Sequence, residues 1–127
     1  MTRQRNDTHS TEFGLWIREQ SEISSFIGYR AYNLDYVWWL KEGYNTNPTV
    51  WTLLEEKRFM SKLRADQRLT YQWLHKKLIS LNDHTYKGIH LIQFENTNPD
   101  DGNIYLDNEK INKYQLIEFL TFKDLIL

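Results

Sequence analysis

The sequence predicts an α/β domain in which helices flank a mixed β-sheet, and three stretches of the chain carry this prediction. Residues 32–40 and 50–58 are rich in aromatic, leucine and β-branched residues, and the polar segment between them contains turn-forming residues, which is typical of an antiparallel hairpin. Residues 61–81 place leucines on one stripe at helical spacing. Residues 86–94 have the composition of a buried strand, so the order strand, helix, strand predicts a crossover between parallel strands.

The remaining elements are expected to be shorter. Residues 11–19 have apolar positions at the spacing of an amphipathic helix, and residues 23–30 form either a further strand or an irregular lead-in. Residues 104–106 are expected to form a short edge strand. A last helix is expected to begin at Ile111 and Asn112, because Asn112 and the glutamine three residues later match a capping box.

The composition is that of a globular protein. The 127 residues predict a single domain over residues 11–127, preceded by a flexible polar tail over residues 1–10. There are no cysteines, which suits a reducing compartment and leads us to expect a cytoplasmic location. We also expect no secretion signal and no membrane association, because no apolar stretch approaches the length of a transmembrane span.

The net charge of −1 argues against a protein that simply coats nucleic acid, but the charge is unevenly distributed. Between residues 55 and 77 there are seven basic residues and three acidic ones. The basic residues are Lys57, Arg58, Lys62, Arg64, Arg68, Lys76 and Lys77. Any basic surface is therefore expected on one face of the domain.

The hairpin predicts a carboxylate pair. Side chains alternate between the two faces of a strand, so Asp35 shares a face with Val37 and Trp39, and Glu55 and Lys57 share a face of the second strand. If the hairpin aligns these faces, two carboxylates and an ammonium group converge. Carboxylates together with water and phosphate oxygens are the ligands that Mg²⁺ prefers.

Two polar residues occupy the leucine stripe of the predicted helix. Gln67 and Tyr71 lie four and eight residues after Leu63, which indicates that the helix faces a polar feature such as the carboxylate pair. Alternatively, the glutamine is satisfied by backbone groups and the tyrosine hydroxyl lies at the rim of the core. Arg64 and Arg68 share a helix face, which is either solvated or flanks the same stripe.

These residues resemble the motifs of a known family. Asp35, followed after nineteen residues by Glu55-Glu56-Lys57 and then by Gln67-Arg-Leu-Thr-Tyr71, is similar to the PD-(D/E)xK nuclease superfamily, and Gln-x-x-x-Tyr resembles its RecB-like branch. The resemblance spans about residues 12–94 by fold order, and its motif residues lie between 35 and 71. It implies a restriction-endonuclease-like core with the order α-β-β-β-α-β and a C-terminal helix. Leu34 departs from the proline that often precedes the family's aspartate.

The resemblance also implies roles. Asp35 and Glu55 would ligate Mg²⁺ or Mn²⁺, with the Glu56 backbone carbonyl as a further ligand, and Lys57 would position or activate the attacking water. Gln67 and Tyr71 would brace the site or contact DNA. The basic residues expected to contact nucleic acid are Arg58, Lys62, Arg64 and Arg68. The family's first-helix glutamate has no clear match: Glu19, and more weakly Glu22, would complete the metal site or would be solvated charges at a helix end.

The leading hypothesis is therefore a divalent-metal-dependent nuclease that hydrolyses DNA phosphodiester bonds. A chain this short leaves no room for a separate recognition domain, so specificity would come from DNA structure, from a homodimer or from a partner protein. A second hypothesis is a nucleic-acid-binding or assembly module that keeps the fold without turnover. A third is an unrelated α/β domain with a chance match, which would hold if Asp35 and Glu55 were far apart.

Overall fold

A computed structural model describes residues 12–23, 30, 32–44 and 46–123, and the chain divides into two compact units, residues 1–32 and 33–127. The first unit contains helix α1 (Glu12–Glu19) and the 3₁₀ helix η1 (Ser21–Ile23). In α1 the rings of Phe13 and Trp16 stack with centroids 6.2 Å apart. The expected strand over residues 23–30 lies mostly outside the described residues. The expectation of one domain over residues 11–127 stays a prediction.

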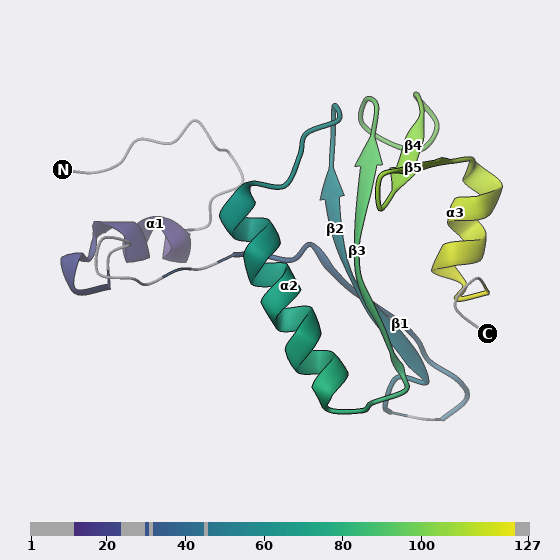
Figure 1. Cartoon of the computed structure of the whole chain (residues 1–127), viewed down its shortest axis with the longest axis horizontal. Coiled ribbons are helices and arrows are strands. Elements are labelled where there is room, and N and C mark those ends of the chain that lie inside the picture. Colours follow the sequence, from purple (N-terminus) through teal and green to yellow (C-terminus); the bar gives the residue numbers. More distant parts are fainter. Residues whose placement is uncertain (1–11, 24–29, 31, 45, 124–127) are drawn as a thin grey trace. The chain divides into compact units, whose positions relative to one another are not determined.

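The second unit is an α/β structure built on a five-stranded mixed sheet, as the sequence predicts (Figure 1). The strands follow one another in the sheet in their order along the chain. They are β1 (Tyr36–Leu40), β2 (Val50–Lys57), β3 (Tyr86–Phe94), β4 (Ile104–Leu106) and β5 (Glu109–Ile111), and the helices are α2 (Ala65–Ser80) and α3 (Lys113–Leu120). The pairs are antiparallel except for β2 with β3, which is parallel and is connected through α2.

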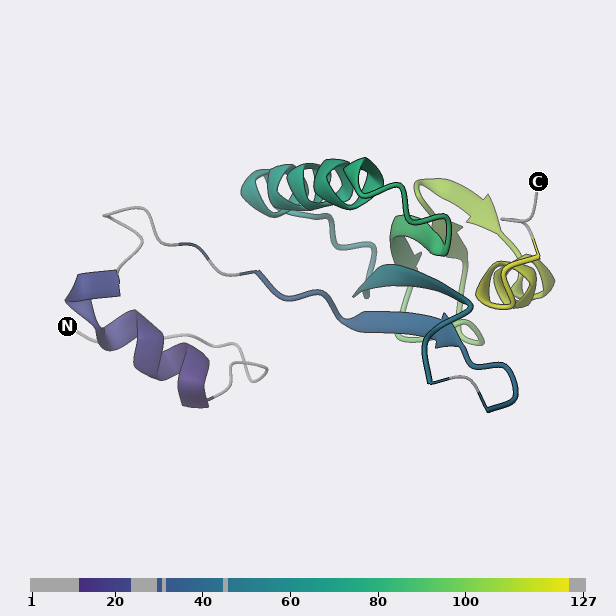
Figure 2. The same ribbon diagram turned by 90° about the horizontal axis from the view of Figure 1, so that it is seen from below.

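The two helices of this unit cover opposite faces of the sheet (Figures 1 and 2). Leu54 of β2 belongs to a buried apolar cluster with residues of α3, whereas its neighbour Glu55 contacts α2. Successive side chains of a strand point to opposite faces, so Leu54 faces the α3 layer and Glu55 faces the α2 layer. The other buried members of the cluster are Ile92, Phe94, Ile104, Leu116 and Phe119. This core packs the sheet on the α3 side, and the α2 side carries Glu55 together with the buried Leu53.

Two elements begin four residues later than the sequence predicts. The first strand begins at Tyr36 rather than at residue 32. Helix α2 begins at Ala65 rather than at residue 61 because the chain first makes a turn, in which Phe59 and Met60 have φ values of 55° and 57°. The Ser61 carbonyl then accepts a hydrogen bond from Gln93 Nε2, which holds this segment against β3.

The C-terminal region also contains a strand that the sequence did not predict. Asp107 and Asn108 have positive φ values of 50° and 73°, the backbone geometry that joins the two strands of a tight hairpin. This turn forms β5, so Ile111 is in a strand and not at the start of a helix. The predicted capping box is confirmed at Asn112: Asn112 Oδ1 accepts from the Gln115 amide, and Gln115 Oε1 accepts from the Asn112 amide.

Among the described residues, none of the helices has the length and apolar character that crossing a membrane requires.

Candidate functional site

Glu55 is a buried carboxylate on the face of the sheet that α2 covers. It lies near the end of β2, and only 4% of its surface is exposed. Burying an ionised carboxylate is unfavourable unless it is paired or hydrogen-bonded. The contacts that the fold supplies to Glu55 therefore define the chemistry of this region.

Helix α2 supplies two of these contacts. Gln67 and Tyr71 are one turn apart on its inward side, and both are buried. Gln67 Nε2 donates to Glu55 Oε2 at 2.7 Å, and the Tyr71 hydroxyl lies 2.6 Å from the same oxygen. Gln67 Nε2 also lies 2.9 Å from the Tyr71 hydroxyl. The helix thus holds one oxygen of the carboxylate from two directions.

The Tyr71 hydroxyl is also hydrogen-bonded to the backbone carbonyl of Asn33. A hydroxyl has a single proton and cannot donate it to Asn33 and Glu55 at once. A proton on Glu55 removes this conflict, because the carboxyl group then donates to the Tyr71 oxygen. The hydrogen-bonding pattern therefore accommodates a protonated Glu55.

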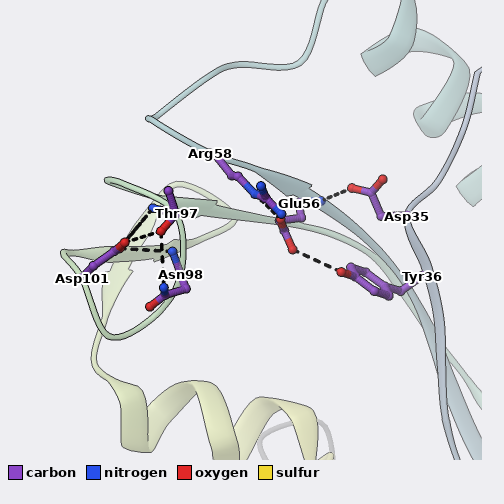
Figure 3. A network of polar contacts seen from close by, with 7 residues as sticks. All are labelled: Asp35, Tyr36, Glu56, Arg58, Thr97, Asn98 and Asp101. Carbon is purple, nitrogen blue, oxygen red and sulfur yellow. Dashed lines mark hydrogen bonds and ion pairs between the residues drawn. The ribbon is translucent and has the colours of Figure 1, made fainter. Parts of the chain in front are cut away.

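Asp35 is brought to Glu55 by the strand register. Tyr36 pairs with Leu54 in the antiparallel ladder, so continuing the register by one residue places Asp35 directly opposite Glu55 and on the same sheet face. Asp35 Oδ2 accepts a hydrogen bond of 2.7 Å from the Glu56 amide, which orients the aspartate at the end of β1 (Figure 3).

The environment raises the pKa of Glu55 from its ordinary value of 4.5 to about 7. Burial is the largest cause, and the neighbouring Asp35 carboxyl adds to it by sharing a proton and by like-charge repulsion. The Tyr71 hydrogen bond and the positive charge of Lys57 oppose the shift. Lys57 shares the sheet face of Glu55, because it lies two residues further along β2.

Glu56, the next residue of β2, points its side chain to the opposite face of the sheet. Glu56 Oε1 accepts from the Tyr36 hydroxyl at 3.2 Å, and its second oxygen pairs with Arg58 Nε at 3.0 Å (Figure 3). The structure therefore brings Asp35, Glu55 and Lys57 together and turns Arg58 toward Glu56 instead. The Glu56 backbone still points toward β1, where its amide reaches Asp35.

A pocket of about 290 Å³ opens beside Glu55. Glu55, Tyr71 and Arg68 contribute to its lining, together with His75 and the β4–β5 turn. The full lining is Glu55, Leu63, Arg68, Tyr71, Gln72, His75, Ile89, His90, Leu91, Asp107 and Asn108. Of the predicted basic residues, Arg68 therefore lies at the pocket, whereas Arg64 is one turn earlier at the exposed N-cap of α2 and Lys62 precedes the helix.

Sequence reasoning missed His75 and the β4–β5 turn. His75 lies four residues after Tyr71 and eight after Gln67, so its helical spacing gave a usable signal. Its Nδ1 is 2.7 Å from the Tyr86 hydroxyl, whose pKa burial raises to about 12. Asp107 and Asn108 reach the pocket only through the folding of the hairpin, for which Asp-Asn is a weaker turn signal than a pair that contains glycine.

Asp101, in the loop after β3, is another acidic residue, but hydrogen bonds within the loop already satisfy its carboxylate. Asp101 accepts hydrogen bonds from the Thr97 hydroxyl and from the Thr97 and Asn98 amides (Figure 3). The hydrogen bond from the Thr97 hydroxyl is the largest cause of the lowered pKa of Asp101. These contacts stabilise the loop and assign no further role to it.

Asp35 and Glu55 are the carboxylates that a cation could use here. In the part of the chain that the structure describes, no group of three or more His, Cys, Asp or Glu side chains is arranged to hold a metal. The hydrogen bonds from Gln67, Tyr71 and the Glu56 amide go to Glu55 Oε2 and Asp35 Oδ2, which leaves Glu55 Oε1 and Asp35 Oδ1 for a shared proton or a cation. Glu19 and Glu22 belong to the N-terminal unit, so their roles stay predictions.

Comparison with known proteins gives no match: no family model fits this chain, and no curated protein or solved structure is significantly similar to it. The relationship to the PD-(D/E)xK superfamily therefore rests on the motif residues and their spacing, and it stays a prediction.

The raised pKa of Glu55 predicts an unusual dependence of stability on pH in metal-free protein. Between pH 4.5 and about 7 the folded state binds more protons than the unfolded state. The contribution of Glu55 to the free energy of unfolding is therefore complete below pH 4.5, and it is lost as the pH rises through 7. The loss is at most about 3 kcal/mol for a shift of this size, because solvent screening reduces the full value. Urea unfolding should show that Glu55→Gln is more stable than the parent at pH 8 and has a flatter profile.

Glu109→Gln is the matched control, because it makes the same change at an exposed position in β5. It should keep the parental pH profile. Parallel profiles for the parent and Glu55→Gln would show that Glu55 titrates alike in the folded and unfolded chains.

Proposed function

We propose that this protein is a divalent-metal-dependent nuclease that hydrolyses DNA phosphodiester bonds. The observation that carries the proposal is the placement of Asp35 opposite Glu55 across an antiparallel strand pair, with Lys57 on the same face. Two carboxylates and a cation on rigid strands form a suitable site for metal-assisted hydrolysis of a phosphate ester.

Three features of the site suit Mg²⁺ or Mn²⁺. Asp35 and Glu55 each keep one oxygen that the hydrogen bonds of Gln67, Tyr71 and the Glu56 amide do not reach, and Mg²⁺ is commonly held by one or two carboxylates, water and substrate phosphate. The Glu55–Asp35 repulsion that raises the pKa of Glu55 would be relieved by a bound cation. Gln67 Oε1 is buried without a partner in the described chain, as expected of an acceptor that an ordered water satisfies.

The metal would stabilise charge on the scissile phosphate and lower the pKa of bound water. Asp35 and Glu55 would hold it, and the Glu56 carbonyl is a further candidate ligand, because the Glu56 backbone points toward Asp35. Gln67 and Tyr71 would act as positioning residues, because with a cation bound both would donate to Glu55 Oε2 and leave the other oxygen for the cation.

Lys57 would orient the attacking water or neutralise phosphate charge. Its ammonium group is close enough to Glu55 to lower the pKa of that carboxyl, so it lies within electrostatic reach of the same site. A protonated lysine cannot be a metal ligand. Its contribution would therefore fall on the reaction rather than on metal binding.

The positive side chains along α2 would contact the DNA backbone. Arg68 lines the pocket that contains Glu55, and Arg64 lies one turn before it. Contacts of this type fix the position of the nucleic acid without reading its sequence.

The proposed activity is tested by incubating the protein with supercoiled, linear and branched DNA in Mg²⁺, Mn²⁺ or EDTA. We expect cleavage with either metal and none with EDTA. Asp35→Asn and Glu55→Gln should each weaken Mg²⁺ binding, measured by calorimetry, and cleavage together, because each removes a negative charge from the cation site. DNA binding without cleavage in any metal would instead support the non-catalytic binding module.

The role of Lys57 is tested by Lys57→Ala, which should lower the cleavage rate by about 10²–10⁴, the range for general acid–base groups. Mg²⁺ affinity should be unchanged or higher, because a like charge is removed from the neighbourhood of the cation. DNA affinity is compared in Ca²⁺, and Lys110→Ala, at an exposed position of β5, is the control for charge. Parental cleavage by Lys57→Ala would exclude this role.

The DNA-binding surface is tested by replacing Arg64 and Arg68 with alanine. DNA affinity should fall to a similar extent for unrelated sequences, and the slope of log affinity against log salt should become shallower by about one for each phosphate that the arginines neutralise. Lys110→Ala combined with Lys123→Ala removes the same charge elsewhere and should leave the slope nearly unchanged. An equal effect of both pairs would place the arginines on an ordinary solvated face.

A further inference from the structure

Strand β1 is an apolar strand at the edge of the sheet. All five of its side chains, Tyr36, Val37, Trp38, Trp39 and Leu40, are exposed, from 41% for Trp38 to 63% for Val37. The strand contains no proline and no charged residue, and its register with β2 is unbroken. Charge, proline and bulges are the features by which edge strands ordinarily avoid pairing with another chain.

The backbone of β1 offers a defined set of hydrogen-bonding groups at this edge. The Glu56 amide points toward β1, so the peptide groups of Leu54 and Thr52 do the same, because alternate residues of a strand face the same neighbour. The peptide groups of their partners, Tyr36 and Trp38, point toward β2. The peptide groups of Val37 and Trp39 therefore face the edge of the sheet that no described strand occupies, called here the open edge. An added strand would pair with these two residues.

We propose that two copies of the chain associate through antiparallel pairing of β1 with β1 of a second copy, about a two-fold axis at Trp38. In this register Val37 lies opposite Trp39 of the partner subunit, so the outward peptide groups of both strands meet. The five-stranded sheets would join into one continuous sheet of ten strands. An isologous interface of this kind needs one surface only, which the β1 edge provides.

The charges at the ends of β1 select this register. Asp35 precedes the strand and Lys41 follows it, so pairing centred on Trp38 places Asp35 opposite Lys41 of the partner subunit, once on each side of the axis. A shift of the axis by one residue in either direction would still let the outward peptide groups of the two strands form hydrogen bonds. It would place Asp35 opposite Trp39 or Gly43, however, and both charge pairs would be lost. Opposite charges across a strand pair are stabilising.

The pairing also affects the candidate site. Directly opposite residues share a sheet face, so Lys41 of the partner subunit would lie on the face that carries Asp35 and Glu55. Each subunit would thus place a positive charge beside the carboxylates of the other. The inference concerns association alone, and its test does not depend on nuclease activity.

The first test is the mass of the full chain in solution, measured by sedimentation equilibrium over micromolar to millimolar concentrations. We expect a concentration-dependent shift toward twice the 15.5 kDa of one chain. Val37→Pro removes an amide that faces the open edge, so it should give a folded monomer; Val37→Thr keeps the amide and should still associate. A single-chain mass for the parent throughout, or unchanged association of folded Val37→Pro, would overturn the proposal.

The second test is the register, for which the absence of native cysteines is an advantage. In the proposed dimer Trp38 faces itself in a non-hydrogen-bonded pair with Cα atoms about 4.5 Å apart, within the range for a disulfide. Leu40 would lie about 13 Å or more from its counterpart, four residues away along the strand. Diamide oxidation should therefore cross-link Trp38→Cys and not Leu40→Cys, whose parent side chain is similarly exposed at 42%. Equal cross-linking of both variants would exclude this register.

Discussion

The burial of the Glu55 carboxyl is the constraint on which the organisation of this domain depends. A carboxylate with 4% of its surface exposed must be compensated, and two parts of the chain supply the compensation. Gln67 and Tyr71 contact it from α2 and Lys57 contributes positive charge from the same strand, whereas Asp35, just before β1, adds a like charge. The apolar core on the α3 side holds β2 in place, which allows the α2 side to concentrate polar groups.

The arrangement around Glu55 is balanced between two states. Without a cation, Asp35 repels the ionised form of Glu55, burial disfavours it, and the pKa is about 7. With a cation, both carboxylates would be ionised and Tyr71 would donate to Glu55. A site that is unfavourable when empty and ionised gains most from a divalent ligand, which links the physical cost of this burial to the proposed chemistry.

The sequence predicted the hairpin, α2, β3 and the capping box of α3, because each has a local signal: alternation, an apolar stripe, a buried run or a cap. The convergence of Asp35, Glu55 and Lys57 followed from strand alternation and a simple hairpin register. The β4–β5 hairpin was missed because its turn uses Asp107 and Asn108 rather than glycine. The burial of Glu55 and its raised pKa could not be predicted from the sequence, since both depend on how closely α2 packs on the sheet.

The carboxyl group of Glu55 can be observed directly, by following its ¹³C chemical shift against pH in the absence and presence of Mg²⁺. A paired, buried carboxyl should titrate near pH 7 in metal-free protein, as the structure indicates, and Mg²⁺ should move the midpoint down by displacing the proton. Asp35→Asn should lower the metal-free midpoint and remove most of the response to Mg²⁺. A midpoint near 4.5 that Mg²⁺ does not change would contradict the account of this site.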